Sequence, residues 1–155
     1  MSDYIPLGSE AKLYRNTGTY GTPTWTECEN VSDLEVGPLG PEMLQIGIRG
    51  MGKRKTYTPG QSDERIKGKM VWRKDSSHEL YADVQAILDA GMDGTQIELL
   101  ALDGDKTTVG CEGLRMTCHI KLETRTENLS EFLSIGFEAH QAPTTNATSW
   151  YVVAS

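Results

Sequence analysis

The stretch DSSHELYADVQAILDAG, residues 75–91, has the pattern of an amphipathic helix in a chain that otherwise has the pattern of strands and turns. Ser76 and Glu79 have the spacing of a capping box, in which each side chain accepts a hydrogen bond from the other residue's backbone amide. Gly91 supplies a left-handed stop, so we predict one helix over about residues 76–90. The apolar residues recur at the spacing of one helical face: Leu80, Val84, Ile87 and Leu88, with Tyr81 beside them. The polar residues lie mostly elsewhere on the wheel: Glu79, Asp83, Gln85 and Asp89.

A helix of about four turns cannot bury its apolar stripe alone, so we expect it to lie on a sheet. The preceding strand, Glu64–Arg73, alternates basic residues on one face with apolar or small residues on the other, namely Ile66, Gly68, Met70 and Trp72. The following strand, Thr95–Leu102, is apolar. After it, Asp103–Asp105 is predicted to form a tight hairpin turn.

The C-terminal third adds long strands. Thr107–Glu123 changes phase near Glu112 and Gly113, which predicts a bulge or sharp bend at that point. Leu129–Ala139 is a further strand with its apolar residues in phase. The terminal Trp150–Val153 is too aromatic and β-prone for a frayed end, so we expect it to pack on this subunit or on a neighbour.

The N-terminal part adds short strands. Trp25–Cys28 and Val31–Val36 form one extended stretch, and Glu10–Arg15 alternates Ala11 and Leu13 against Lys12 and Tyr14. Six or seven strands and one helix favour a mainly β fold, a β-sandwich or barrel with the helix covering one open edge or end. We expect one domain, divided as follows: an N-terminal arm over residues 1–9, the β domain over 10–140 and a C-terminal tail over 141–155.

The segment 37–63 differs from the rest, because it holds six glycines and three prolines. Loops of this length are uncommon inside compact domains and tend to be functional or disordered. A free linker would not normally hold so many apolar side chains. We infer an assembly loop that is mobile in the monomer and becomes ordered against a partner, a hairpin being one form it could take. Its apolar residues are Met43, Leu44, Ile46, Ile48, Met51 and Tyr57.

Charge is distributed unevenly along the chain, whose net charge is −7. Between Arg49 and Lys74 lie nine of the fifteen Lys and Arg residues beside only Asp63 and Glu64, which gives +7; the remainder has six basic and twenty acidic residues, which gives −14. An acidic body argues against general nucleic-acid binding. A basic segment on an acidic body allows copies of one protein to attract each other, although these residues could equally solvate one strand and its loop.

The sequence contains no recognisable motif for catalysis, cofactor binding or metal binding. His78, His119 and His140 are far apart in the sequence, and the three cysteines, Cys28, Cys111 and Cys118, have no metal-ligand spacing and read as ordinary strand residues. No glycine-rich loop opens a helix, and no serine lies in a nucleophile elbow. No apolar run approaches the roughly 18 residues that span a bilayer. The first residues lack a secretory signal, so we expect folding in a reducing cytoplasm. Because no catalytic motif is found, we expect no enzymatic activity.

Taken in order, these features resemble the major tail tube proteins of long-tailed, siphovirus-like bacteriophages. The resemblance covers about residues 10–140. It rests on an early strand NVSDLEV at 30–36, the long loop RGMGKRKTYTPGQSD at 49–63, and a strand, helix, strand passage formed by IKGKMVW at 66–72, the helix at 75–91 and IELLALDG at 97–104.

The resemblance implies a small β-sandwich or barrel with one flanking helix, similar also to the ring protein of type VI secretion. It further implies hexameric rings that stack into a tube, through which double-stranded DNA passes without specific binding. The implied partners are copies of the chain and other tail proteins: the terminator, the tape measure and the baseplate. The implied location is the virion tail, after synthesis in the host cytoplasm. Because the resemblance is nearer to noncontractile tails, we expect no sheath.

Two sets of residues are the candidate sites. We expect inter-subunit contacts from the assembly loop: Ile46, Ile48, Arg49, Met51, Lys53, Arg54, Lys55 and Tyr57. A conduit for DNA must repel phosphates, so acidic side chains on the polar faces of the late strands are the candidates for the lumen. These are Glu112, Glu123, Glu131 and Glu138.

Two other interpretations of the function are open besides a tail tube protein. One is another phage tail ring component, such as a terminator or connector. The other is a soluble β-sandwich binding module that uses its Trp and Tyr residues for recognition, although Trp25, Trp72 and Trp150 belong to separate elements.

Overall fold

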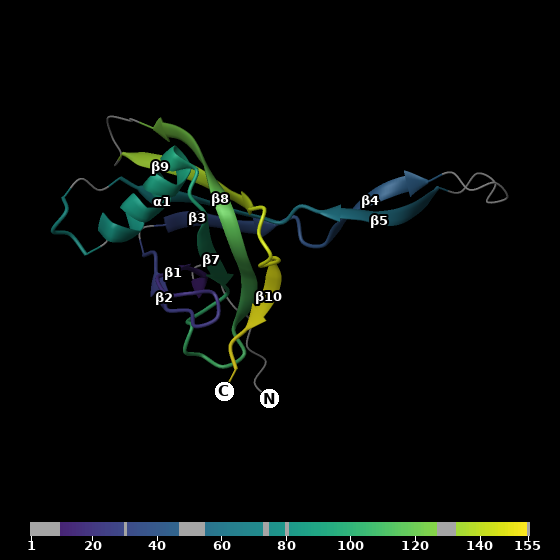
Figure 1. Cartoon of the computed structure of the whole chain (residues 1–155), viewed down its shortest axis with the longest axis horizontal. Coiled ribbons are helices and arrows are strands. Elements are labelled where there is room, and N and C mark those ends of the chain that lie inside the picture. The colour runs from purple at the N-terminus through teal and green to yellow at the C-terminus, as the bar shows by residue number, and fades with distance from the viewer. Residues whose placement is uncertain are drawn as a thin grey trace.

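A single curved antiparallel sheet dominates the computed structural model, which describes residues 10–29, 31–46, 55–72, 75–79, 81–126 and 133–154 (Figure 1). Its strands run in the order β2-β1-β7-β8-β9-β6-β3, and β10 pairs with β8 beyond the end of β9. The bounds are β1 Lys12–Asn16, β2 Trp25–Glu27, β3 Val31–Gly37, β6 Arg65–Val71, β7 Ile97–Leu102, β8 Glu112–Thr126, β9 Ser134–Gln141 and β10 Ser149–Val152.

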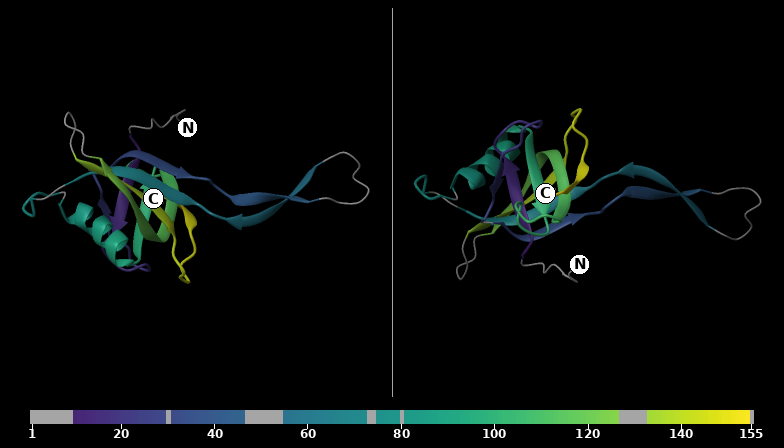
Figure 2. Two further views of the ribbon diagram at one scale, coloured as in Figure 1. Left: turned by 90° about the horizontal axis from the view of Figure 1, so that it is seen from above. Right: turned by 90° about the horizontal axis from the view of Figure 1, so that it is seen from below.

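The two remaining strands, β4 Pro41–Ile46 and β5 Thr56–Ser62, pair only with each other. They form a hairpin that leaves the body between β3 and β6 and projects far from it (Figures 1 and 2). We call these two strands the arm. The described part of the predicted loop 37–63 therefore includes a hairpin, one of the forms expected for it.

Curvature of the sheet brings β1 into contact with β3, so the body approaches a barrel. The main core lies inside this curve and includes Ile66, Met70, Leu99, Met116 and Phe137, each fully buried. A smaller core lies on the opposite face of β1 and β7, where it gathers Tyr14, Trp25, Leu100, Leu102 and Val153. Strand β7 is thus buried on both faces, which explains its nearly unbroken apolar sequence.

The same two-sided burial corrects the prediction for β1. Leu13 and Tyr14 were expected on opposite faces, one apolar and one polar, yet both are buried because each face of β1 has its own core. The Tyr14 hydroxyl accepts a hydrogen bond from the Lys106 amide at 3.0 Å. The alternation of β6 is confirmed, since Ile66 and Met70 are fully buried and Trp72 packs on the main core.

The helix α1, Tyr81–Asp93, lies against the inner face of the sheet and begins later than predicted (Figure 2). The turn before it is closed by Asp75, whose carboxylate accepts from the Ser77 amide at 3.0 Å and hydroxyl at 2.6 Å, so the predicted start at Ser76 is wrong. Val84, Ile87 and Leu88 are buried as predicted, and Leu80 lies outside the described residues.

The helix also ends later than predicted. Gly91 is inside α1, and a β-carbon there would lie 2.4 Å from Leu122 Cγ, so the glycine permits close contact with β8. The left-handed stop is Gly94, with φ of 73° and its amide donating to the Ala90 carbonyl at 3.1 Å.

Asp83 lies on the core side of α1, against the expectation for a polar residue. Arg15 Nη2 and Nε both donate to Asp83 Oδ1, at 2.9 and 3.2 Å, and the aspartate is 4% exposed. This ion pair connects the helix to β1 and makes a buried carboxylate tolerable, because the guanidinium supplies both charge and hydrogen bonds.

The connection from β7 to β8 is longer than the predicted hairpin turn. Residues 103–111 form a loop in which the Asp105 carboxylate accepts from the Thr107 amide at 2.8 Å and hydroxyl at 2.7 Å. The apparent phase change near Glu112 therefore marks the start of β8 and not a bulge. A register shift does occur in β8, between Leu122 and Arg125 against β9.

Candidate assembly surfaces

The arm is held together by backbone pairing from Ile46 opposite Thr56 to Pro41 opposite Ser62. At its outer described end, Thr56 Oγ1 donates to the Ile46 carbonyl at 2.8 Å. Nearer the body, Leu44 lies across Gly60, where a β-carbon would be 3.0 Å from Leu44 Cγ. No third strand or helix of this chain pairs with the arm among the described residues, and a two-stranded hairpin alone is at best marginally stable in water.

Apolar side chains on the arm face solvent. Met43 is 59% exposed, Leu44 44% and Tyr57 56%, and Leu39 at the root is also exposed. A concentration of exposed apolar residues on one projecting element indicates a surface that a partner covers. Of the predicted assembly residues, Ile46 is half-buried, while Lys55 and Tyr57 are exposed. The others lie outside the described residues: Ile48, Arg49, Met51, Lys53 and Arg54.

A charged cluster fixes the point where the arm joins the sheet. Arg65, the first residue of β6, contacts Asp63 at 2.6 Å through Nη2 and Glu138 at 3.0 Å through Nη1. His140 Nε2 lies 3.2 Å from the same Glu138 oxygen. The hydrogen bond from Arg65 lowers the pKa of Asp63 below its ordinary value. Arg65 thereby links Asp63, which follows β5, to Glu138 on β9.

The outer face of the sheet carries alternating charges, because Glu35, Lys67, Glu138 and Lys121 stand opposite one another on four adjacent strands. A shallow hollow of about 650 Å³ lies over this face. Its lining includes three lysines and three carboxylates: Lys67, Lys69, Lys121, Asp33, Glu35 and Glu123. Such cross-strand pairs stabilise a solvated face and leave it balanced in charge.

The predicted lumen residues do not gather on one acidic surface. Glu123 is exposed and lies over Gly136, where a β-carbon would be 2.8 Å from its Oε2. Glu138 is only 7% exposed and is paired with Arg65. Glu112 is exposed at the opposite end of β8, and Glu131 lies outside the described residues.

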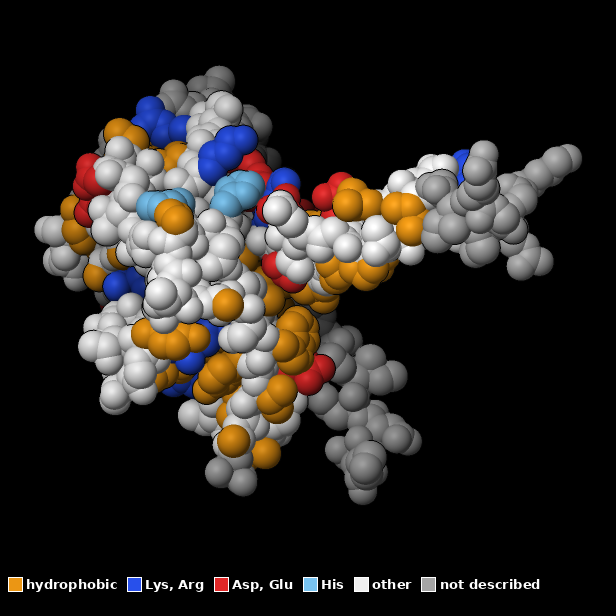
Figure 3. Space-filling view, turned by 45° about the vertical axis from the view of Figure 1, so that its right-hand side comes forward, with side chains coloured by type: hydrophobic (Ala, Val, Ile, Leu, Met, Phe, Trp, Pro, Cys, Tyr) orange, Lys and Arg blue, Asp and Glu red, His pale blue; other side chains and the backbone are white. Residues whose placement is uncertain are grey.

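An apolar groove of about 200 Å³ lies between the root of the arm and β10. The residues that form it come from five separate parts of the chain, and among them are Leu34, Val36, Leu39, Leu102, Gly113 and Trp150. Two carboxylates, Asp103 and Glu112, also line it. Figure 3 shows apolar side chains gathered just below the root of the arm. Sequence analysis missed this groove, because only the sheet topology brings these residues together.

β10 builds one wall of this groove and confirms that the terminal stretch packs on its own subunit. Trp150 pairs with Leu114 and Tyr151 with Gly113 in the backbone register, and Val153 is buried in the smaller core. Trp150 nevertheless remains 50% exposed. Strand β10 therefore joins the body while presenting an aromatic side chain to solvent.

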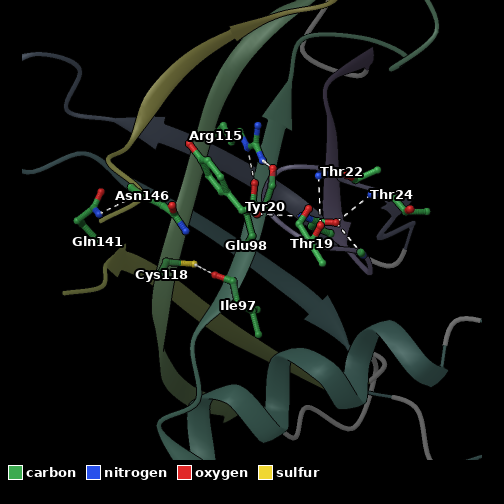
Figure 4. Close-up of polar contacts among 12 residues, drawn as sticks. Thr19, Tyr20, Thr22, Thr24, Ile97, Glu98, Arg115, Cys118, Gln141 and Asn146 are labelled. Carbon is green, nitrogen blue, oxygen red and sulfur yellow. Dashed lines mark hydrogen bonds and ion pairs between the residues drawn. The ribbon is translucent and has the colours of Figure 1, made fainter. Parts of the chain in front are cut away.

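A second polar cluster surrounds Arg115, which contacts residues from a strand and from a loop (Figure 4). The Arg115 guanidinium pairs with Glu98, donates to the Tyr20 carbonyl at 2.7 Å and lies 4.1 Å from the Tyr20 ring centroid. Asn16 Nδ2 donates to the other Glu98 oxygen at 2.9 Å. These contacts attach the loop 17–24 to the sheet.

The cysteine and histidine side chains of the described residues do not form a recognisable catalytic or metal-binding group. Burial raises the pKa of Cys28 and of Cys118 to about 12, which keeps both as unreactive thiols at neutral pH. His119 and His140 are far apart in the sequence but are direct neighbours across β8 and β9. Within the part of the chain that the structure describes, no group of three or more His, Cys, Asp or Glu residues is placed to hold a metal ion. In the same part, no helix combines the length and apolarity needed to cross a membrane.

No protein-family model and no curated protein matches this sequence. Solved structures do share its fold. A chain in the tail of an empty gene transfer agent particle with C6 symmetry is 12% identical, with a TM-score of 0.66 over 96% of this chain and 100% of that one. A chain in the virion of the native gene transfer agent is 11% identical, with a TM-score of 0.64 and the same coverage.

A third structure is more distant. A chain in the sixfold-symmetrised baseplate of the anti-feeding prophage is 9% identical, with a TM-score of 0.51 over 92% of this chain and 91% of that one. At these identities the likeness shows the fold. The expected mainly β, tail-tube-type fold with one flanking helix is thereby confirmed.

Proposed function

We propose that this chain is a structural subunit of a phage-like tail, which assembles into hexameric rings that stack into a tube. One observation carries the proposal: the fold matches, over nearly its whole length, a chain from a tail with C6 symmetry. The exposed apolar arm supports it independently, because such an element indicates a surface that is covered on assembly.

The proposed tube is a conduit for double-stranded DNA during genome ejection. A net charge of −7 favours passage without binding, because carboxylates repel phosphates. Glu112 and Glu123 are exposed in the single subunit and remain candidates for the lumen, whereas Glu138 is neutralised by Arg65. The role is mechanical and involves no catalysis.

The proposed partners follow from position in a tail. They are copies of this chain in the same and adjacent rings, together with the terminator, tape measure and baseplate proteins. The location is the virion tail, reached from the host cytoplasm, and we propose a noncontractile tail without a sheath.

A second candidate is a ring component at one end of a tail, which the likeness to a baseplate chain favours. Negative-stain microscopy of the concentrated, purified chain separates the two. Stacked rings or tubes are expected for a tube subunit, and single rings that never stack for an end component. A chain that stays monomeric at every concentration contradicts both.

A further inference from the structure

We infer that the apolar groove between the arm root and β10 binds the arm of a second copy of this chain. The inference rests on the proposed function and adds to it the surface that receives the arm. It assigns one subunit two different contact surfaces, a projecting arm and a groove.

The groove has the character of a binding surface for apolar side chains. Val36, Leu39 and Trp150 are among its lining residues, and Leu39 is 57% exposed and Trp150 50% exposed. Val36 and Trp150 lie on sheet strands and Leu39 follows β3 directly, so the groove is formed before any partner arrives.

The arm has the complementary character. Met43, Leu44 and Tyr57 project from it without a covering element among the described residues. The arm cannot place these residues in the groove of its own chain, because it leaves the body beside that groove and extends away from it (Figures 1 and 2). A second copy can provide a groove for the arm of the first copy and an arm for its groove.

Charge favours the same pairing. Asp103 and Glu112 line the groove, and Glu112 has no ion-pair partner among the described residues. Lys55 is exposed at the outer described end of the arm, directly before the returning strand β5, and no acidic residue occurs in the sequence between Glu42 and Asp63. The positive charge of Lys55 beside the arm is therefore attracted to a groove with an acidic lining.

The contact joins two different patches, so it is heterologous. Heterologous contacts propagate, closing into rings or continuing as filaments. A single arm-to-groove contact, repeated from copy to copy, therefore produces a repeating assembly from one kind of subunit.

Cysteine cross-linking in the full chain tests the contact. In a Cys111→Ser background, Tyr57→Cys or Met43→Cys on the arm is mixed with Trp150→Cys in the groove, and a short bifunctional maleimide is added after assembly. We expect at least one arm and groove mixture to give about tenfold more cross-linked dimer than either variant alone. Met92→Cys, exposed on α1 away from both surfaces, replaces Trp150→Cys in the control.

The outcomes separate the two proposals. Normal tubes with no arm-to-groove cross-link overturn the groove assignment and leave the tube intact. A wild-type chain that never assembles contradicts the proposed function itself. Tyr4→Cys linked to Trp150→Cys within one copy would show that residues 1–9 fill the groove, which also overturns the inference.

A charge substitution gives an independent readout. Trp150→Glu should raise the protein concentration needed for assembly by about tenfold or more, because aromatic residues in buried contacts carry much of the binding energy. Met92→Glu, which adds the same charge outside both surfaces, should leave that concentration unchanged. Circular dichroism and thermal unfolding establish that both variants fold, and equal assembly by both contradicts the inference.

Discussion

The body and the arm differ in what covers their apolar side chains. In the body, Phe137 and Met116 are fully buried by strands and a helix of the same chain. On the arm, Met43 and Tyr57 are more than half exposed. The body therefore supplies its own stability, whereas we propose that other copies of the chain cover the arm. Changes to the body should act on folding, and changes to the arm should act on assembly.

The largest effect on folding is expected from Val84→Asp. Val84 is fully buried on α1, and an unpaired carboxylate there costs about 4 kcal/mol or more, which is a large part of a domain's stability. Urea unfolding measured by circular dichroism should show little or no native transition. Ala82→Asp, two residues earlier on the exposed side of α1, is the control and should fold; a native transition for Val84→Asp equal to that of the control contradicts the assigned core face.

A smaller effect is expected from Asp83→Asn, which leaves the Arg15 guanidinium without its anionic partner in a largely buried position. We expect a loss of about 2–3 kcal/mol in the free energy of unfolding, somewhat below that of a fully buried pair. Asp63→Asn, at the exposed root of the arm, breaks a pair of the same chemistry and should leave the urea midpoint near that of wild type. Equal losses of unfolding free energy in both variants would contradict the claim that the ion pair in the body contributes more to folding than the one at the root of the arm.

A pH-dependent effect is expected from Asp105. Hydrogen bonds from Thr107, with help from Lys12, lower the pKa of Asp105 from 3.8 to about 2. A lowered pKa in the folded state stabilises the fold above about pH 4, and this contribution is lost as the pH falls towards 2. In Asp105→Asn, the thermal midpoint should therefore fall less between pH 4 and pH 2 than in wild type. Asp89→Asn, exposed on α1, serves as the control, and identical pH profiles for wild type and Asp105→Asn contradict the effect.

The smallest effect on folding is expected from the segment that connects the two strands of the arm in the sequence. Reversal of Lys53, Arg54 and Lys55 to glutamate should leave the unfolding midpoint unchanged and yield a monomer that no longer polymerises, because like charges then oppose the acidic body of the next copy. Sedimentation velocity measures the loss of assembly. Tubes of normal length from this variant would show that these charges are not in a contact.

Local patterns predicted much of the body. The alternation of Ile66 and Met70 and the helical spacing of Val84 and Ile87 identified the core correctly, because each pattern depends only on neighbouring residues. The partner of Asp83 is Arg15, on strand β1 and 68 residues away in the sequence, so no local pattern could show that the aspartate is buried. The helix boundaries failed for a similar reason, since Asp75 and Gly94 compete with equally plausible local signals at Ser76 and Gly91.

The assembly surfaces were predictable only in part. The apolar content of 37–63 indicated a segment with a partner, and the exposure of Met43 and Tyr57 agrees with that interpretation. The groove could not be foreseen, because Val36 and Trp150 meet only through the pairing of β10 with β8. The balanced charge of the outer face likewise depends on cross-strand register, which places Lys67 and Lys121 beside Glu138, one of the glutamates that the sequence suggested for a lumen.

The dependence of assembly on the arm is tested most directly by negative-stain microscopy of wild type beside a variant with Met43→Ser, Leu44→Ser and Tyr57→Ser. Both proteins are first shown to have the same thermal midpoint, and both are then examined at the same high concentration. We expect stacked rings or tubes from wild type and dispersed monomers from the variant. Tubes of normal length from the variant would contradict the claim that the exposed arm holds the assembly together.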